Sequence, residues 1–239
     1  MKKIGMPLLE ASGICCKNKK ASIDSFNLSV GKGDSLAVLH DNIPAAELLT
    51  EILSGKTEPN KGKLFFKGEN ITGQRNNFGV VRKKAAISKN KTVSENGAVP
   101  LIKRGLSRVI ATVAAQKELA SFDMQDYGTT TVSALPDNIA YRAELFLAYM
   151  WSHDVIVIDE PFESFSESEK AEELKWLKSV AGKTGLATLI LTQSIDTALA
   201  LSDTVMAVNN QMSSIGMIGV DRNQLDKTRM RIEVLTGGG

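Results

Sequence analysis

The chain has 239 residues, of which 43% are hydrophobic, so it can form one large α/β domain or two small ones with a sizeable core. Its 29 basic and 27 acidic residues give a formal net charge of +2, which makes no electrostatic case for nucleic-acid binding. The sequence contains no signal-peptide pattern and no apolar run of about 18 residues. These features predict a cytosolic protein.

The first third of the sequence predicts mainly strands. Polar turn segments such as Gly31-Lys-Gly-Asp separate short apolar runs. A helix is predicted directly after residues 35–39, and EPNKGKLFFKGENIT, with its proline and glycines, predicts a hairpin. The predicted strands cover residues 8–10, 26–30, 35–39, 63–66 and 78–81.

Cys15 and Cys16 are the only two cysteines, and they are adjacent. Neighbouring residues of a strand point to opposite faces, so the pair is poorly placed for a disulfide. Two cysteines without nearby histidines also cannot complete a zinc site. We therefore interpret them as two small strand residues.

The middle and the end of the chain predict helices followed by α/β alternation. Residues 93–123 and 141–151 are rich in helix-forming residues and resemble an inserted helical section. Ser166 and Glu169 form a capping box that opens an amphipathic helix, which we expect to end near Gly182. Apolar runs predict buried strands, and strands alternating with helices predict a mostly parallel sheet. Strands are predicted at residues 155–158, 187–191 and 204–208, with a short helix at residues 195–201.

The string DVIVIDEPFESF, residues 154–165, carries the strongest chemical signal. Asp159 stands at the expected carboxyl end of a buried strand, where a carboxylate can hold a magnesium ion through water. Glu160 could then act as a base on an attacking water molecule. The alternative is that the two acidic residues only terminate the strand and begin a loop.

The order of these segments resembles the ATP-binding subunits of ABC transporters over nearly the whole chain. LTEILSGKTEPNKGKLFFKGENIT, FGVVRKKAAISKNKTVSEN and ALALSDTVMAVNNQMSSIG are each similar to the family's segments in that order. The helical section and TVSENGAVPL are also similar to sugar-type importers. The resemblance implies one P-loop NTPase-like ABC ATPase domain over residues 1–239, with a mostly parallel sheet and an N-terminal antiparallel β-subdomain. It also implies a helical subdomain at about residues 93–151.

The resemblance places the family's phosphate loop, GxxGxGK[ST], on residues 40–47. There His40, Ile43 and Ala45 replace glycines, Ala46 replaces the lysine, and Glu47 replaces the hydroxyl residue that holds magnesium. A side chain at a left-handed glycine position costs roughly 1–2 kcal/mol if the loop keeps its shape. Pro44 suits a first helical turn, and Glu47 in that turn would satisfy the helix dipole. A turn repaired after losing its ligand and a non-standard phosphate site are both compatible with this stretch.

The other nucleotide-contacting positions implied by the resemblance have also changed. Its signature sequence falls on residues 135–139, where Pro136 removes a hydroxyl and an N–H and Asp137 adds a negative charge. The remaining departures are Asn138 in the signature, Lys83 for the glutamine of the loop facing the membrane subunit, Gln193 for the switch histidine, Ser166 for an aspartate, and Asn18 near the adenine-stacking aromatic.

The retained residues are Asp159, a magnesium ligand only if nucleotide binds, and Glu160, which we expect to be idle. The family pairs two subunits head to tail, and this chain would spoil both composite sites. The sequence therefore predicts a pseudo-ATPase at the cytoplasmic membrane face, without cofactor. Its partner would be a transmembrane permease, another ABC ATPase subunit, or both, as a homo- or heterodimer. The alternatives are an active subunit using ATP and magnesium at an unorthodox site, or a freestanding scaffold protein.

Overall fold

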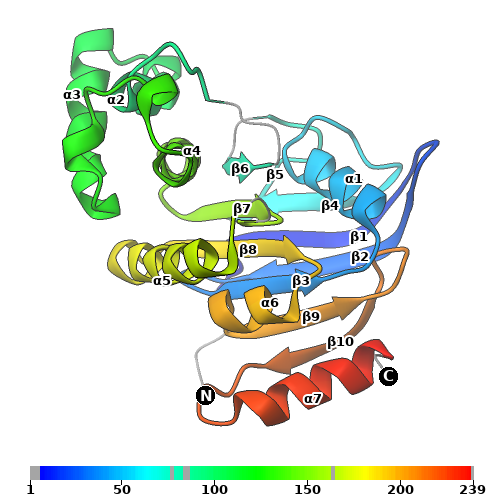
Figure 1. The fold of residues 1–239 in the computed structure, drawn as a ribbon. Coiled ribbons are helices and arrows are strands. Elements are labelled where there is room, and N and C mark those ends of the chain that lie inside the picture. Colours follow the sequence, from blue (N-terminus) through cyan, green and yellow to red (C-terminus); the bar gives the residue numbers. More distant parts are fainter. Residues whose placement is uncertain (1–5, 76–77, 83–86, 163–164, 238–239) are drawn as a thin grey trace.

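The computed structural model describes residues 6–75, 78–82, 87–162 and 165–237. Its strands form two sheets (Figure 1). The first sheet is antiparallel and has the order β2-β1-β4-β5. Its strands are β1 (Leu9–Lys17), β2 (Ser22–Val30), β4 (Lys61–Phe66) and β5 (Glu69–Asn70). This sheet is the predicted N-terminal antiparallel subdomain.

The second sheet has the order β10-β9-β3-β8-β7-β6, and all neighbours in it are parallel except β10 and β9. Alternate residues of its buried strands face different cores, as the pleat requires. Ile156 and Ile158 face one core, whereas Val155 and Val157 face the other. The strands are β3 (Ser35–Leu39), β6 (Gly79–Val81), β7 (Val155–Asp159), β8 (Ala187–Thr192), β9 (Thr204–Val208) and β10 (Ser214–Gly219).

Two hydrophobic cores lie on opposite faces of the parallel sheet. One core contains α1 (Ile43–Leu53) together with the inner side of the antiparallel sheet. The other contains α5 (Glu167–Thr184), α6 (Ile195–Leu201) and the helices of the middle section. The sheet therefore has covered faces, and its carboxyl-end edge is left to carry a site, as in other open α/β sheets.

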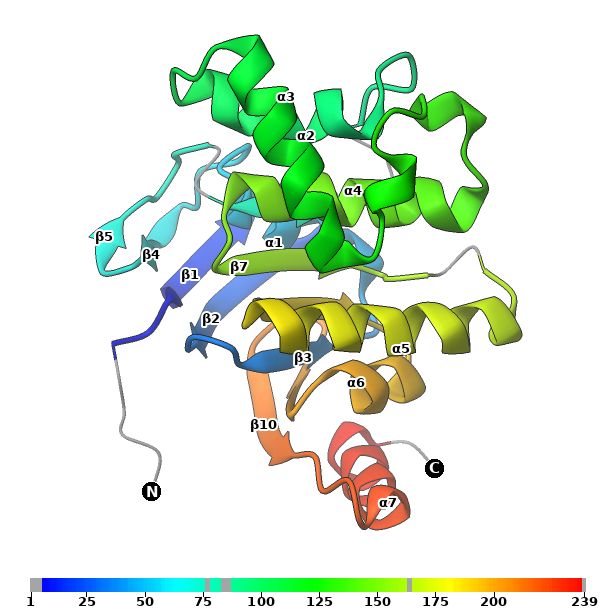
Figure 2. The same cartoon turned by 90° about the vertical axis from the view of Figure 1, so that its left-hand side faces the viewer.

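The helical section stands beyond the sheet on the side of β6 and β7, where α4 (Asp137–Trp151) packs on both strands (Figure 2). Helix α2 (Val93–Lys103) packs against α3 (Arg108–Glu118) and α4. Short 3₁₀ turns at Leu119–Phe122, Gln125–Tyr127 and Val132–Ala134 connect α3 to α4. Within the part of the chain that the structure describes, none of the helices has both the length and the apolar character that a membrane span requires.

Most predicted elements are present, and their ends differ. Strand β1 continues to Lys17 through two bulges, so it contains both cysteines, which are free thiols. The capping box of Ser166 and Glu169 is formed, but α5 ends at Thr184 rather than near Gly182 because Gly185 supplies the left-handed cap. Strand β10 and helix α7 (Leu225–Thr236) were not predicted, because their many polar residues leave no clear periodic pattern of apolar residues.

Candidate functional site

The turn between β3 and α1 is short, because β3 ends at Leu39 and α1 begins at Ile43. Helix α1 begins at Ile43, so Ile43, Ala45, Ala46 and Glu47 are all helical. Asn42 is the N-cap, and its side-chain oxygen accepts a hydrogen bond from the Ala45 N–H at 3.1 Å. The left-handed glycine positions that the sequence comparison assumed are absent at Ile43 and Ala45 because the helix has replaced them.

The prediction that Glu47 sits in the first turn of α1 is wrong. The helix starts earlier than expected, so its first turn holds no acidic residue, and Glu47 is exposed one turn further on. The Asn42 side chain, rather than Glu47, accepts a hydrogen bond from a free N–H group at the start of the helix. Pro44 lies in the first turn, as predicted. Ala45 and Ala46 are 0% and 1% exposed and pack in the core beneath the helix.

The same turn is bonded to the loop between β9 and β10. The Asn42 side-chain nitrogen donates to the Asn210 carbonyl at 2.8 Å. The Asn210 amide, with its nitrogen turned toward Asp41, donates to the two oxygens of that carboxylate at 2.5 and 3.0 Å. Polar groups of this turn thus bind Asn210, which is 168 positions from Asn42 in the sequence, because the strand order brings β3 beside β9.

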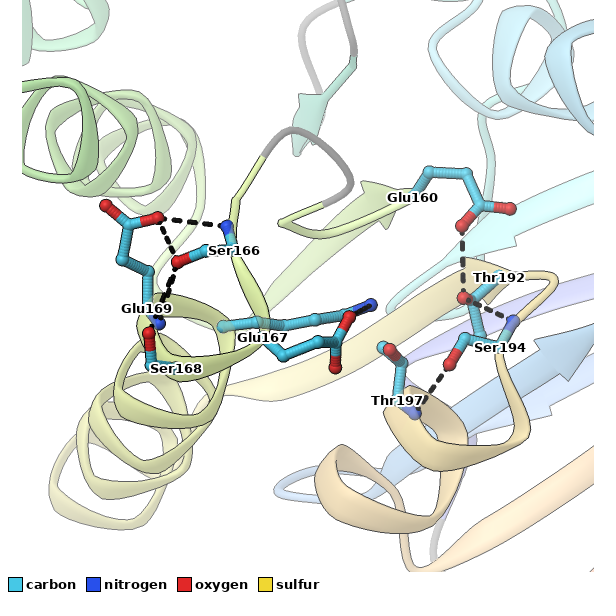
Figure 3. A network of polar contacts seen from close by, with 9 residues as sticks. Glu160, Ser166, Glu167, Ser168, Glu169, Thr192, Ser194 and Thr197 are labelled. Atoms are coloured by element: carbon cyan, nitrogen blue, oxygen red, sulfur yellow. Dashed lines mark hydrogen bonds and ion pairs between the residues drawn. The ribbon is translucent and has the colours of Figure 1, made fainter.

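Glu160 is held at the carboxyl-end edge of the parallel sheet by Thr192, the last residue of β8 (Figure 3), and by Gln193, which follows that strand. Its carboxylate accepts hydrogen bonds from the Thr192 hydroxyl at 3.1 Å and from the Gln193 backbone N–H at 2.8 Å. The Nε2 atom of buried His40 lies 3.5 Å from the same carboxylate. The backbone of Glu160 is left-handed, with φ 49°, which turns the chain sharply after β7.

The other residues predicted at this edge have separate surroundings. Asp159 is the last residue of β7 and is 7% exposed. Gln193 follows β8 and its side chain is exposed, while its backbone binds Glu160. Ser166 caps α5, and its N–H and hydroxyl bind the Glu169 carboxylate at 2.9 and 2.5 Å (Figure 3). Lys83 lies outside the described residues.

The predicted signature residues open helix α4. Pro136 precedes its first turn, and the Asp137 side chain is exposed there. Asn138 turns toward α5, where its amide donates to Glu173 at 3.2 Å. Arg142, one turn later, binds the 1% exposed Glu173 with two hydrogen bonds of 2.8 Å each. The start of α4 is thereby tied to α5 by protein groups.

The family model described as ABC transporter matches residues 47–163. The taurine import ATP-binding protein TauB of Pseudomonas aeruginosa is 26% identical over 197 residues, which are 82% of this chain and 75% of TauB. The sulfate/thiosulfate import ATP-binding protein CysA of Mesostigma viride is also 26% identical, over 79% of this chain and 55% of CysA. By these matches the chain is similar to ABC transporter ATP-binding proteins.

Solved structures confirm the ABC ATPase fold. The cbiO1 protein of Clostridium perfringens superposes with a TM-score of 0.78 at 16% identity, covering 97% of this chain and 96% of cbiO1. A nucleotide-free ATP-binding cassette from an ABC transporter superposes with a TM-score of 0.76 at 19% identity, over 94% and 96% of the two chains. At these identities the likeness establishes the fold alone. The family match on the sequence begins at Glu47, after the altered β3–α1 turn.

In this chain, an aromatic cluster beside Asp159 and Glu160 was missed from the sequence. The ring of Tyr141 on α4 lies 5.0 Å from that of Phe162 and 5.8 Å from that of Phe165. Phe162 and Phe165 stack at 5.9 Å. The quoted string DVIVIDEPFESF contains both phenylalanines, but only the fold brings Tyr141 to them.

Proposed function

We propose that this chain is a catalytically degenerate ABC subunit, a pseudo-ATPase that keeps the cassette fold for its protein contacts. The start of α1 at Ile43 carries the proposal. Phosphate loops bind anions with a series of backbone N–H groups ahead of the helix. Here residues 43–47 of the segment 40–47 belong to the helix, and the Asn42 side chain already accepts a hydrogen bond from the Ala45 N–H.

The remaining positions support the same conclusion. Glu160 binds Thr192 and Gln193 of its own chain, so its carboxylate is engaged without a nucleotide. Asn138 is engaged by Glu173. Asp137 and Pro136, which the resemblance places in the family's signature sequence, lie at the start of α4. Both composite sites of a head-to-tail pair would therefore lose their phosphate contacts.

The residues at hand do not suit a magnesium nucleotide. Asp159 could hold a magnesium ion through water, but its usual companions on the phosphate loop, a lysine and a hydroxyl, are replaced by buried Ala46 and exposed Glu47. A carboxylate at Glu47 adds repulsion toward phosphate where attraction is needed. We derive no hydrolytic step for this chain.

The experiment is calorimetric titration of the purified chain with ATP and magnesium. We expect no binding heat at millimolar ATP and an unchanged melting temperature. A bound ligand in hundredfold excess over its Kd would add about 2.7 kcal/mol of stability, which a melting curve detects easily. Micromolar binding that weakens in Asp159→Ala and Glu160→Gln would contradict the proposal.

An active subunit with an unorthodox site is the second candidate, and the position of Glu160 favours it. The carboxylate lies at the sheet edge used for catalysis in α/β proteins, 3.5 Å from His40. His40, when protonated, would supply a cation near that edge. Nucleotide-dependent phosphate release that disappears in both Glu160→Gln and His40→Ala would support this candidate over the first.

We also propose that the chain docks on a transmembrane permease at the cytoplasmic membrane face, and that it belongs to an importer. Relatives named as import ATP-binding proteins support the import role. The surface between the sheet and the helical section contains a cavity of about 450 Å³, lined in part by Arg82, Lys91, Val99 and Trp151. Similarity to sugar-type importers stays a prediction.

Affinity capture from solubilised membranes tests this docking. The tagged chain should recover a permease, and Val99→Glu should reduce that recovery strongly because it places a charge in the cavity. Met217→Glu, an equivalent change on exposed β10, is the matched control and should leave recovery unchanged. If the unaltered chain recovers no permease, the freestanding scaffold becomes the better proposal.

A further inference from the structure

A second cavity lies where α4 and α5 approach the end of β7. Its volume is about 750 Å³, and among the described residues it is lined by five acidic and two basic side chains. The acidic residues come from both helices and from the sheet edge, so they surround the space rather than cluster on one side. A cavity of this size accepts a small organic ligand or a long side chain.

Aromatic rings form part of the cavity wall. Tyr141 and Phe165 are half-buried and line it, and Phe162, which is 1% exposed, packs against both rings. The faces of aromatic rings attract cations. Carboxylates beside such rings add attraction for the same sign of charge, and they repel phosphate.

Two polar groups of the cavity, the Tyr141 hydroxyl and the Glu144 carboxylate, have few hydrogen-bond partners among the described residues. The Tyr141 hydroxyl is buried, and within the described residues it has no hydrogen bond of good geometry, although the Phe162 backbone acts on it. Buried polar groups without partners are rare, so this hydroxyl calls for a ligand atom or a water molecule. Glu144, also on the wall, makes no hydrogen bond or ion pair among the described residues, although Lys89 acts on it at longer range.

The two basic side chains of the cavity, Arg82 and Lys89, do not neutralise its five acidic side chains. The Arg82 guanidinium donates to the Thr50 carbonyl at 2.9 Å and to the Ser54 hydroxyl, so it is directed toward α1. Lys89 is exposed. Burial raises the pKa of Glu144 to about 7, and the attraction of Lys89 offsets this only in part.

The arrangement favours an organic cation over a metal ion. Within the described ranges, no three His, Cys, Asp or Glu side chains converge as a metal site requires. A guanidinium group is planar, stacks on aromatic rings and donates several hydrogen bonds in fixed directions. It could therefore face the Phe165 ring while donating to Glu144 and to the Tyr141 oxygen.

We propose that the cavity lined by Tyr141, Phe165 and Glu144 binds a guanidinium group. The group would come from a free small molecule or from an arginine side chain of a partner chain.

Calorimetric titration with three probes tests this site. Agmatine represents the free small molecule, the capped peptide Gly-Gly-Arg-Gly-Gly represents a chain-borne side chain, and the same peptide with citrulline is its uncharged match. We expect at least one guanidinium probe to bind with a Kd of about 1 mM or lower, and the citrulline peptide to bind at least about tenfold more weakly. Tighter binding of the arginine peptide than of agmatine indicates a partner chain, and the reverse indicates a small molecule.

Variants locate the binding. Glu144→Gln and Phe165→Leu should each weaken guanidinium binding by about tenfold. Tyr141→Phe removes one hydroxyl, keeps the ring and should weaken binding without lowering the melting temperature. Glu172→Gln, an exposed carboxylate of α5 outside the cavity, should have no effect. Equal binding of the citrulline and arginine peptides, or unaltered binding by a folded Tyr141→Phe and Glu144→Gln, would overturn the proposal.

Discussion

At the scale of single residues, Glu173 is a buried carboxylate that depends on its hydrogen-bond partners. It is 1% exposed and receives two hydrogen bonds from Arg142 and one from Asn138, so a buried charge is fully engaged between α4 and α5. The Arg142 guanidinium also stacks over the Trp176 ring at 4.7 Å. These contacts hold the start of α4 in place against the helix that follows β7.

We predict that Glu173→Ala lowers the free energy of unfolding by about 3–5 kcal/mol, because it leaves the charge of Arg142, whose side chain is only 19% exposed, without its partner. Urea denaturation monitored by the two tryptophans measures this. The double variant Glu173→Leu with Arg142→Met removes both charges and should recover most of the loss. A loss below about 1 kcal/mol in the single variant would mean that water already reaches the pair.

Glu144 gives the stability of the protein a pH dependence. Burial raises its pKa in the folded chain from 4.5 to about 7. The folded state therefore holds the proton more tightly than the unfolded state. The stabilising contribution is complete below pH 4.5 and is lost as the pH rises through about 7.

Above that range, Glu144→Gln should be more stable than the unaltered chain by about 1–2 kcal/mol, after allowance for solvent screening of a half-buried group. Near pH 4.5 the two proteins should have equal stability. Melting temperatures across this pH range provide the measurement, with Glu172→Gln as the exposed control. A constant difference at all pH values would assign the effect to packing rather than to ionisation.

At the scale of elements, helix α1 shows what the altered turn has become. The resemblance to the family places its lysine at Ala46, yet Ala46 is 1% exposed and belongs to the core beneath α1. A long charged side chain cannot enter that core without desolvation and overpacking. Restoring the lysine therefore does not restore a phosphate site.

We predict that Ala46→Lys destabilises the fold by at least about 3 kcal/mol and produces no ATP binding. Glu47→Lys, on the exposed side of the same helix, should change stability by less than about 0.5 kcal/mol. Chemical denaturation and ATP titration of both variants decide the matter. A stable Ala46→Lys that binds ATP would show that the turn still folds as a phosphate loop.

The buried strands could be predicted from the sequence, whereas the start of α1 and the cavity around Tyr141 could not. Continuous apolar runs identified β7, β8 and β9 because burial on both faces leaves little ambiguity in strands of this type. The start of α1 could not be placed from the sequence. Asn42 and Pro44 indicate a helix that begins at Ile43, whereas the resemblance to the family indicates a loop over the same residues. The cavity around Tyr141 was also unpredictable, since it joins residues from α4 and from the end of β7 that share no local pattern.

At the scale of the whole molecule, the helical section and the sheet differ in how deeply they are buried. Strands β7 and β8 are buried along their whole lengths, whereas α3 has only Ala111 and Ala115 buried. Val109, Ile110 and Val113 of α3 are at least half exposed. Local opening is easier where few apolar contacts are lost. The helical subdomain at residues 93–151 stays a prediction, and its opening offers a test.

Native-state hydrogen exchange should show α3 exchanging at low denaturant, well before β7 and β8, which should open only with global unfolding. Peptide-level mass spectrometry resolves these elements, and α4, packed on β6 and β7, should follow the sheet. Equal protection of α3 and β8 would mean that the section unfolds together with the rest of the molecule.

The bonds from Asn42 and Asp41 to Asn210 have a consequence for any assembly that contains this chain. A ligand shifts a conformational equilibrium only through unequal affinity for its states. If, as proposed, the β3–α1 turn binds no nucleotide, a change in the cellular ATP level cannot shift the conformation of this chain. Such a subunit would keep one conformation throughout the transport cycle, and the conformational changes driven by ATP would occur in its partners.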